Sequence, residues 1–318
     1  MMRSAPLLVV ISVILAAGLS GCLDSPRSSV EPARDAPADE ARSGPLGFDV
    51  EATSSDDIVR CADPTASLPP RAFCGTRVFT LSGTLVADAL RLDLVGLRGD
   101  VTILDAPADA FEFVATVRAS GVTEASVASA FDAGWAVEIV DGATARLSAR
   151  TTPGDLPYSD GSVDALAFAI HMPRHLRLSM AEVETSQGVI TIGGISADSL
   201  RLTTSEAAIG VLADVANLTA TTSGAAINLV TRPLASGQFH LTTQNGAIRV
   251  EVVEAARHGY DVTASMAGRG EIEVALDDGD HGTTPSGAQT FRSQSFANRV
   301  IKTALVAQTS NETITITG

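Results

Sequence analysis

The second half of the chain repeats one pattern, and this repeat constrains the fold more than any other feature. Each copy has apolar residues at alternate positions, then a Thr, and five positions later an Ile that opens a second alternation. The clearest copies are Leu200-x-Leu202-x-Thr204…Ile209-x-Val211 and Leu218-x-Ala220-x-Thr222…Ile227-x-Leu229. The first four copies carry this Thr at intervals of 19, 18 and 21 residues. A period near 20 is typical of proteins built from stacked repeats.

The alternation within each copy predicts short β-strands with one apolar side. One copy cannot bury that side alone, so the copies must stack. The sequence therefore predicts an all-β fold, a β-solenoid similar to a parallel β-helix, with coils of about 20 residues. Gly, Thr, Ser, Val and Ala are abundant, and the aromatic content is only 4%. The residues expected to line the interior are Ile190, Ile192, Ile209, Val211, Ile227, Leu229, Ile248, Val250, Ile272, Val274, Ile314 and Ile316.

The first 21 residues read as a lipoprotein signal peptide. Arg3 precedes an apolar run over residues 7–19 that is too short to span a bilayer as a mature helix. The run ends in Leu19-Ser20-Gly21-Cys22, which resembles the prokaryotic lipobox. In that interpretation Cys22 is lipidated and anchors the protein to a membrane without crossing it. An ordinary secretory signal with an incidental Cys22 is the alternative.

The rest of the chain divides by composition. Residues 22–47 combine the anchor Cys with a linker rich in Pro, Ser, Ala and charged residues, which predicts disorder. Residues 48–175 carry scattered strand patterns, and those near 90–103 resemble one degenerate copy of the repeat. Residues 176–318 hold the clear repeats. The pattern leaves open whether 48–175 adds coils to the solenoid or forms a separate β cap.

Cysteine usage agrees with export. Of three Cys residues, Cys22 belongs to the lipobox, which leaves Cys61 and Cys74 as a pair. We expect a disulfide between them, worth about 3 kcal/mol in the chain-entropy model. Two free thiols are the alternative. A metal site is not expected, because no His lies near either Cys in the sequence.

The charge excludes one class of partner. The net charge is −15, with a single Lys among the 22 basic residues. An acidic chain of this kind is not expected to bind nucleic acid through phosphate contacts.

The stretch from about residue 90 onward resembles a known family. The residues that carry the resemblance are Ile170-His171-Met172-Pro173, residues 184–190, and the Thr-to-Ile elements at 204–209, 222–227, 243–248 and 309–314. They are similar to the "putative adhesin" domains of unknown function, which occur on bacterial and archaeal surface proteins and are built as β-solenoids. Residues 268–270 and 277–304 depart from that pattern. The resemblance implies a surface location and a solenoid fold, and it supplies no catalytic residues.

Catalytic and metal-binding patterns are sparse. The five His residues are scattered, and neither HExxH nor GxSxG occurs. Asp277, Asp278 and Asp280 surround a Gly turn and are a weak candidate for Ca²⁺, although their spacing is not that of an EF-hand. A solvated acidic loop is the simpler interpretation. We expect no catalytic residues and no cofactor.

Three functions remain compatible with these observations. The leading one is a non-enzymatic, membrane-anchored, extracytoplasmic lipoprotein whose solenoid presents a rigid surface to an unknown protein or glycan. The second is a structural or regulatory envelope component without an external ligand. The third is a carbohydrate-active enzyme on a β-helix scaffold, which would need paired carboxylates about 5 to 10 Å apart.

Overall fold

The computed structural model describes residues 48–65, 71–85, 87–106, 110–140, 144–151, 160–254 and 257–318. The expected signal peptide, Cys22 and linker lie outside these residues. The described part is nearly all β, and its strands form one sheet that is not closed. The elements are β1 (Phe48–Thr65), β2 (Arg71–Leu85), β3 (Ala89–Val95), β4 (Arg98–Asp105), β5 (Phe111–Gly121), α1 (Glu124–Ala133), β6 (Trp135–Val140), β7 (Ala145–Thr151), β8 (Gly161–Met172), β9 (Arg177–Thr185), β10 (Ile190–Thr204), β11 (Ile209–Thr222), β12 (Ile227–Pro233), β13 (Gly237–Thr243), β14 (Ile248–Val252), β15 (Gly259–Met266), β16 (Ile272–Ala275), β17 (Gly279–Thr283), β18 (Gln289–Ser293), η2 (Phe296–Asn298), β19 (Lys302–Thr309) and β20 (Ile314–Thr317).

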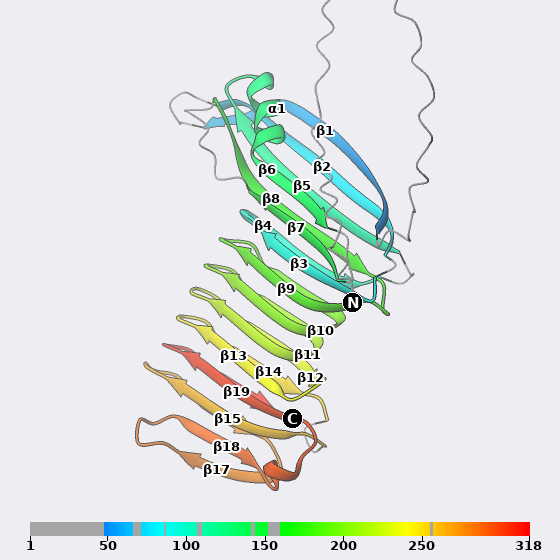
Figure 1. Ribbon diagram of the computed structural model, residues 1–318. Helices are drawn as coiled ribbons and strands as arrows, with labels where there is room; N and C mark the ends of the chain where they lie inside the picture. Colours follow the sequence, from blue (N-terminus) through cyan, green and yellow to red (C-terminus); the bar gives the residue numbers. More distant parts are fainter. Residues whose placement is uncertain are drawn as a thin grey trace, which may run out of the picture.

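The strands are arranged in two ladders, which together make a tall stack (Figure 1). Ladder A runs in the order β6, β7, β3, β9, the second half of β10, the second half of β11, β13, β19, β15, β18 and β17. Ladder B runs in the order β1, β2, β5, β8, β4, the first half of β10, the first half of β11, β12, β14, β20 and β16.

The central part of each ladder is parallel, from β7 to β15 in ladder A and from β8 to β16 in ladder B. One strand from each ladder makes one layer of the stack. The long strands β10 and β11 cross from ladder B to ladder A. In β10 the pairing slips by one residue beside Gly194, whose φ of +71° suits a residue without a side chain.

The repeated Ile residues lie in register along ladder B. Ile190 pairs with Ile209, Ile209 with Ile227, and Ile227 with Ile248, and the row continues through Ile314 to Ile272. Because alternate residues of a strand point to opposite sides, the same register brings the other inward residues together. The two ladders share one apolar core, which also contains Leu202 and Leu218 from ladder A.

The expected interior residues differ in burial at one end of ladder B. Ile190, Ile192, Ile209, Val211, Ile227, Leu229, Ile248, Val250, Ile314 and Ile316 are buried. Ile272 and Val274 are only partly buried. Their strand, β16, pairs on one side only among the described residues, so no further layer covers it.

The recurring Thr residues are buried and tie successive layers together. Each Thr hydroxyl donates to a backbone carbonyl in the turn of the neighbouring layer, as in Thr222 Oγ1 to Ala207 O at 3.0 Å and Thr243 Oγ1 to Ala225 O at 3.0 Å. Thr185, Thr204 and Thr309 make the corresponding bonds to Gly99, Gly188 and Gly246. A buried carbonyl without a donor is costly, so the Thr stabilises each corner of the stack.

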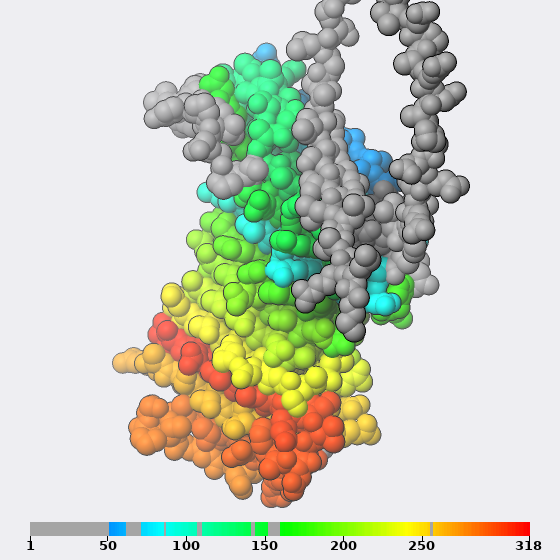
Figure 2. Space-filling model, in the orientation of Figure 1, coloured from blue at the N-terminus to red at the C-terminus, as the bar shows by residue number. Residues whose placement is uncertain are grey.

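The order of the layers differs from the order of the chain at both ends. The layer of β3 and β4 lies between that of β7 and β8 and that of β9 and β10. The layer of β19 and β20 lies between that of β13 and β14 and that of β15 and β16, and in Figure 2 red residues accordingly lie between yellow and orange ones. Residues 277–304, which depart from the family pattern, include the segment that allows the chain to return into this gap.

Antiparallel strands lie at both ends of the stack, although β16 of ladder B stays uncovered. At one end β1, β2 and β5 extend ladder B, and α1 packs against β2, β5 and β8 (Figure 1). A capping box between Thr123 and Ser126 starts α1, and its buried Val127 and Phe131 lie against Gly75 of β2. At the other end the hairpin of β17 and β18 pairs with β15. Residues 48–175 therefore contribute both parallel layers and an antiparallel end.

Candidate binding surface

The outer side of ladder B carries a broad surface without charged residues. Two of its rows can be followed in register across the sheet: Thr80, Val114, Ala169, Thr102, Thr191, Gly210 and Asn228 form the first, and Leu104, Gly193, Leu212 and Val230 form the second. Val78, Thr116 and Ala167 form a third, shorter row. We call these residues the uncharged surface. Their side chains are small or apolar, and all are at least partly exposed.

Ionisable residues begin at the margins of the uncharged surface. On β14, the strand after β12, the outward residues are Arg249 and Glu251. On β5 and β8 the next outward residues are Glu112 and His171, whose Oε2 and Nδ1 atoms lie 3.1 Å apart. The exposed Asp100 of β4, two residues before Thr102, is a further charge at the margin. Charge is therefore absent within the three rows and present around them, on a chain whose net charge is −15.

An apolar hollow of about 210 Å³ lies at the edge of the uncharged surface, at the corner where ladder B turns toward ladder A. Leu212, Val230 and Val253 line it, and Leu212 and Val253 are 57% and 41% exposed. Arg232 and Asp214 form an ion pair at the same hollow. The hydrogen bond to Asp214 raises the pKa of Arg232 above its ordinary value, so Arg232 stays charged at physiological pH.

The outer side of ladder A differs, because it is ionic from β7 to the second half of β10. Arg146 Nε lies 2.6 Å from Asp93 Oδ2, and Arg91 Nη2 lies 3.2 Å from Asp93 Oδ1. Arg201 and Glu182 follow in the next layers, with 3.8 Å between Nη1 and Oε1. These charges neutralise one another across neighbouring strands, as solvated surface pairs commonly do.

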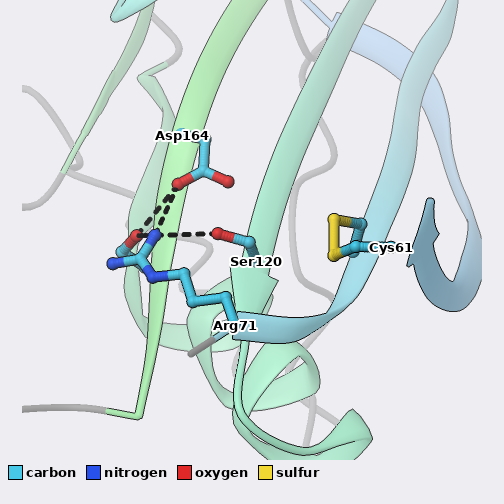
Figure 3. The surroundings of a disulfide bond; sticks show 6 residues. Cys61, Arg71, Ser120 and Asp164 are labelled. Atoms are coloured by element: carbon cyan, nitrogen blue, oxygen red, sulfur yellow. Dashed lines mark hydrogen bonds and ion pairs between the residues drawn. A yellow bond between two sulfur atoms is a disulfide. The ribbon is translucent and has the colours of Figure 1, made fainter. Parts of the chain in front are cut away.

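The expected disulfide is present between Cys61 of β1 and Cys74 of β2 (Figure 3). Close to it, Arg71 Nη1 donates to Ser120 Oγ at 2.7 Å and to Asp164 Oδ1 at 2.9 Å, and it also bonds Ser162. The disulfide fixes the edge strand β1 to β2, and Arg71 fixes the start of β2 to β5 and β8. A disulfide of this kind indicates an oxidising, extracytoplasmic compartment.

The structure does not bring the candidate Ca²⁺ ligands together. Asp278 Oδ2 accepts a hydrogen bond from Arg299 Nη2 at 3.0 Å, and Asp277 and Asp280 are not gathered around a common point with it. Within the described ranges, no group of three or more acidic, His or Cys residues is arranged to hold a metal ion. The acidic loop is better explained as a solvated turn of the β17–β18 end.

Among the described residues, Glu273 has no second carboxylate opposite it on the neighbouring strand of ladder B. Glu273 of β16 pairs with Thr315, and Thr315 pairs with Arg249 on the far side. The neighbouring strand therefore offers a hydroxyl and a cation where a second acid would be needed.

One buried polar pair lies at the C-terminal end of the stack. Tyr260 Oη is 3.5 Å from His258 Nδ1, and both residues are buried. Burial lowers the pKa of His258 and raises the pKa of Tyr260, because it disfavours the charged form of each group. Both side chains are therefore neutral at pH 7 and act as core residues.

Sequence reasoning missed several residues of these surfaces. Leu212 and Val253 do not belong to the inward rows. Their sequence positions do not show that they are exposed, because this depends on which side of the strand faces the core. Arg98 and Arg118, which line a second hollow described below, lie on different strands, and nothing in their local sequence connects them.

Comparisons with known proteins give weak likenesses. No family model and no curated protein matches the chain. Among solved structures, a "putative cell adhesion protein" from Clostridium sporogenes aligns with 83% of this chain and 99% of its own, at 9% identity and a TM-score of 0.43. A "putative adhesin" from Bacteroides fragilis aligns with 79% of this chain and 98% of its own, at 9% identity and a TM-score of 0.23. A "putative lipid binding protein" from Parabacteroides distasonis aligns with 74% and 96%, at 11% identity and a TM-score of 0.24. These values are too low to transfer a function.

Among the described residues, no helix is both long enough and apolar enough to cross a bilayer.

Proposed function

We propose that this protein is a non-enzymatic lipoprotein, anchored outside the cytoplasm through Cys22, whose β-solenoid presents the uncharged surface of ladder B to a partner protein. The observation that carries the proposal is the absence of charge within the three rows of this surface, whereas ladder A is ionic from β7 to the second half of β10.

The solenoid part of the proposal is supported by register. Parallel strands of successive repeats pair residue for residue in both ladders, and the corner Thr bonds recur from layer to layer. Such a stack is rigid because each layer is hydrogen-bonded on both sides. A rigid surface loses little entropy when a partner binds to it.

The composition of the surface favours a protein partner. The cores of protein interfaces are depleted of charged residues, and contiguous apolar patches on soluble proteins commonly mark such sites. Leu212 and Val253 supply exposed apolar groups at the hollow. None of the residues of the uncharged surface is aromatic, so it lacks the rings on which sugars commonly stack. A structural envelope component would use the same surface toward a permanent neighbour.

The proposal is tested by comparing variants in intact cells. Leu212→Glu places a charge at the hollow, whereas Thr242→Glu places the same charge on the exposed outer side of ladder A. We expect chemical crosslinking to recover one partner with the wild type and with Thr242→Glu, and to lose it with Leu212→Glu. Equal recovery with both variants would contradict the proposal.

The anchor is tested separately. Cys22→Ser is expected to move the protein from the membrane fraction to the soluble extracytoplasmic fraction, because no lipid can then be attached. Retention of the variant in the membrane fraction, measured by immunoblot after washing at high salt, would contradict lipid anchoring.

A further inference from the structure

A second hollow, of about 390 Å³, lies on the outer side of the sheet near the disulfide, separate from the apolar hollow. Its lining includes Arg98 of β4, Arg118 of β5 and Asp57 of β1, with Thr76 of β2 between the last two. Its volume falls within the range of small-molecule sites, which is about 300 to 1,000 Å³.

The two arginines project from the strands on either side of β8. Arg118 pairs with Ala165 and Arg98 with Leu166, so β8 runs between them. The outward residue of β8 at this point is the small Ala165, and it leaves the space between the two strands open. The pairing of β4 with β8 is irregular between Arg98 and Val101, and Arg98 and Arg118 both line the one hollow.

Both guanidinium groups are without partners in the part of the chain that the structure describes. No ion pair or hydrogen bond engages the side chain of Arg98 or of Arg118. Of the seventeen arginines in the described residues, eleven form ion pairs: Arg71, Arg77, Arg91, Arg146, Arg174, Arg177, Arg201, Arg232, Arg257, Arg292 and Arg299. Arg98 and Arg118 are two of the remaining six, and they line the same hollow. On a chain with a net charge of −15, acidic partners are plentiful, so two unpaired arginines at one opening mark a site for an external anion.

The hydrogen-bond acceptors around the hollow indicate which groups the rest of the ligand carries. Asp57 lies in one row with Thr76 and Arg118, and Asp164 has Oδ1 bound to Arg71 while also lining the hollow. The lining holds two arginines and two carboxylates, and one of these carboxylates, Asp164, is already paired with Arg71 outside the lining. One positive charge is therefore left to be balanced. A phosphate dianion would be repelled by the two carboxylates, whereas hydroxyl groups next to a single carboxylate would donate to them.

From this geometry we propose that the hollow binds the carboxylate of a sugar acid, such as a uronic acid unit of an acidic polysaccharide. Arg98 and Arg118 bind the carboxylate, and Asp57, Asp164 and Thr76 accept hydrogen bonds from the ring hydroxyls. The hollow opens to solvent, so the neighbouring units of a polysaccharide chain can extend beyond it. This site does not depend on the proposed protein partner and goes beyond it.

The test is titration calorimetry of the full chain with sodium D-glucuronate, with D-glucose, inorganic phosphate and L-glutamate as comparison ligands. Saturable binding of glucuronate, without binding of glucose, is the expected result. Binding of phosphate or glutamate with equal or higher affinity than glucuronate would overturn the assignment to a sugar acid, and so would the absence of glucuronate binding at 50-fold excess over the protein.

Three variants locate the binding. Arg118→Gln removes one cation, and Ala165→Leu fills the opening without changing the charge; each is expected to weaken glucuronate binding at least tenfold. Arg269→Gln, an exposed arginine at the far end of the stack, removes the same charge and is expected to leave binding unchanged. Equal weakening by Arg269→Gln would show that binding follows overall charge and would overturn the site. Leu212→Glu separates the two proposals, because it should abolish partner crosslinking and leave glucuronate binding intact.

Discussion

The two ladders have the same interior and opposite exteriors. Inside, both present Ile, Leu, Val and Ala to one core, and both continue the same register from layer to layer. Outside, ladder A carries paired Arg, Asp and Glu from β7 to β10, whereas the uncharged surface of ladder B carries no ionisable residue within its three rows. Stacking determines the inward residues of both ladders and leaves the outward residues free. The difference between the two exteriors is therefore better explained by function than by folding.

The largest expected effect concerns the interior, where the ladders should behave alike. Ile209→Ala in ladder B and Leu218→Ala in ladder A each leave a cavity in the core, and each should lower the free energy of unfolding by about 2 to 5 kcal/mol. Urea unfolding measures both. If only one of the two substitutions were destabilising, the ladders would not share one core.

A smaller effect is expected at the corner that joins the ladders. Thr222→Val keeps the shape of the side chain but leaves the carbonyl of Ala207 without its donor, so it should cost about 1 to 3 kcal/mol. Thr221→Val, one residue earlier, changes an outward side chain of ladder A and should stay within about 0.5 kcal/mol. Equal effects at the two positions would show that the hydrogen bond from Thr222 to Ala207 does not stabilise the fold.

The ionic exterior of ladder A should contribute little. Asp93→Asn removes the shared partner of Arg91 and Arg146, and we expect a loss of about 0.2 to 1 kcal/mol. Because surface charges are screened by salt, the difference from the wild type should vanish in about 1 M NaCl. A loss that persists at high salt would assign Asp93 a structural role that its partial exposure does not suggest.

The smallest effect on stability is expected on the uncharged exterior of ladder B. Leu212→Glu exchanges an exposed apolar side chain for a charged one, and the free energy of unfolding should change by less than about 0.5 kcal/mol. The same substitution should abolish partner crosslinking. A large loss of stability would mean that Leu212 supports the stack, and the contrast between the two exteriors would then need another explanation.

The repeat alone predicts much of the stack. The spacing from Thr to Ile places Ile190, Ile209, Ile227 and Ile248 in neighbouring strands, and the structure has them in register. The Cys61–Cys74 disulfide also follows from the sequence, because only two cysteines remain once Cys22 is assigned to the lipobox. The repeat is a local pattern that can be read from the spacing, and the two remaining cysteines allow only one disulfide.

The rest depends on pairing between distant segments, which local patterns do not encode. Similar repeats have similar edges, so the sequence does not state which edge accepts β3 or β19. The antiparallel strands β1, β2 and β5 do not contain the repeat, so their pairing cannot be predicted from its spacing. The hollow between Arg98 and Arg118 exists only because β8 passes between their strands, and that neighbourhood depends on the order of the layers.

The place of β19 and β20 has a consequence for biosynthesis. These strands follow the other described strands in the chain, and they fill a gap between two layers that are made earlier. Until they emerge, the facing edges of β13 and β15 have unsatisfied backbone groups, which are prone to pair with other chains. The stack can therefore be completed only after residues 302–317 have been made, and a nonsense mutation near codon 300 should yield a product that aggregates or is degraded.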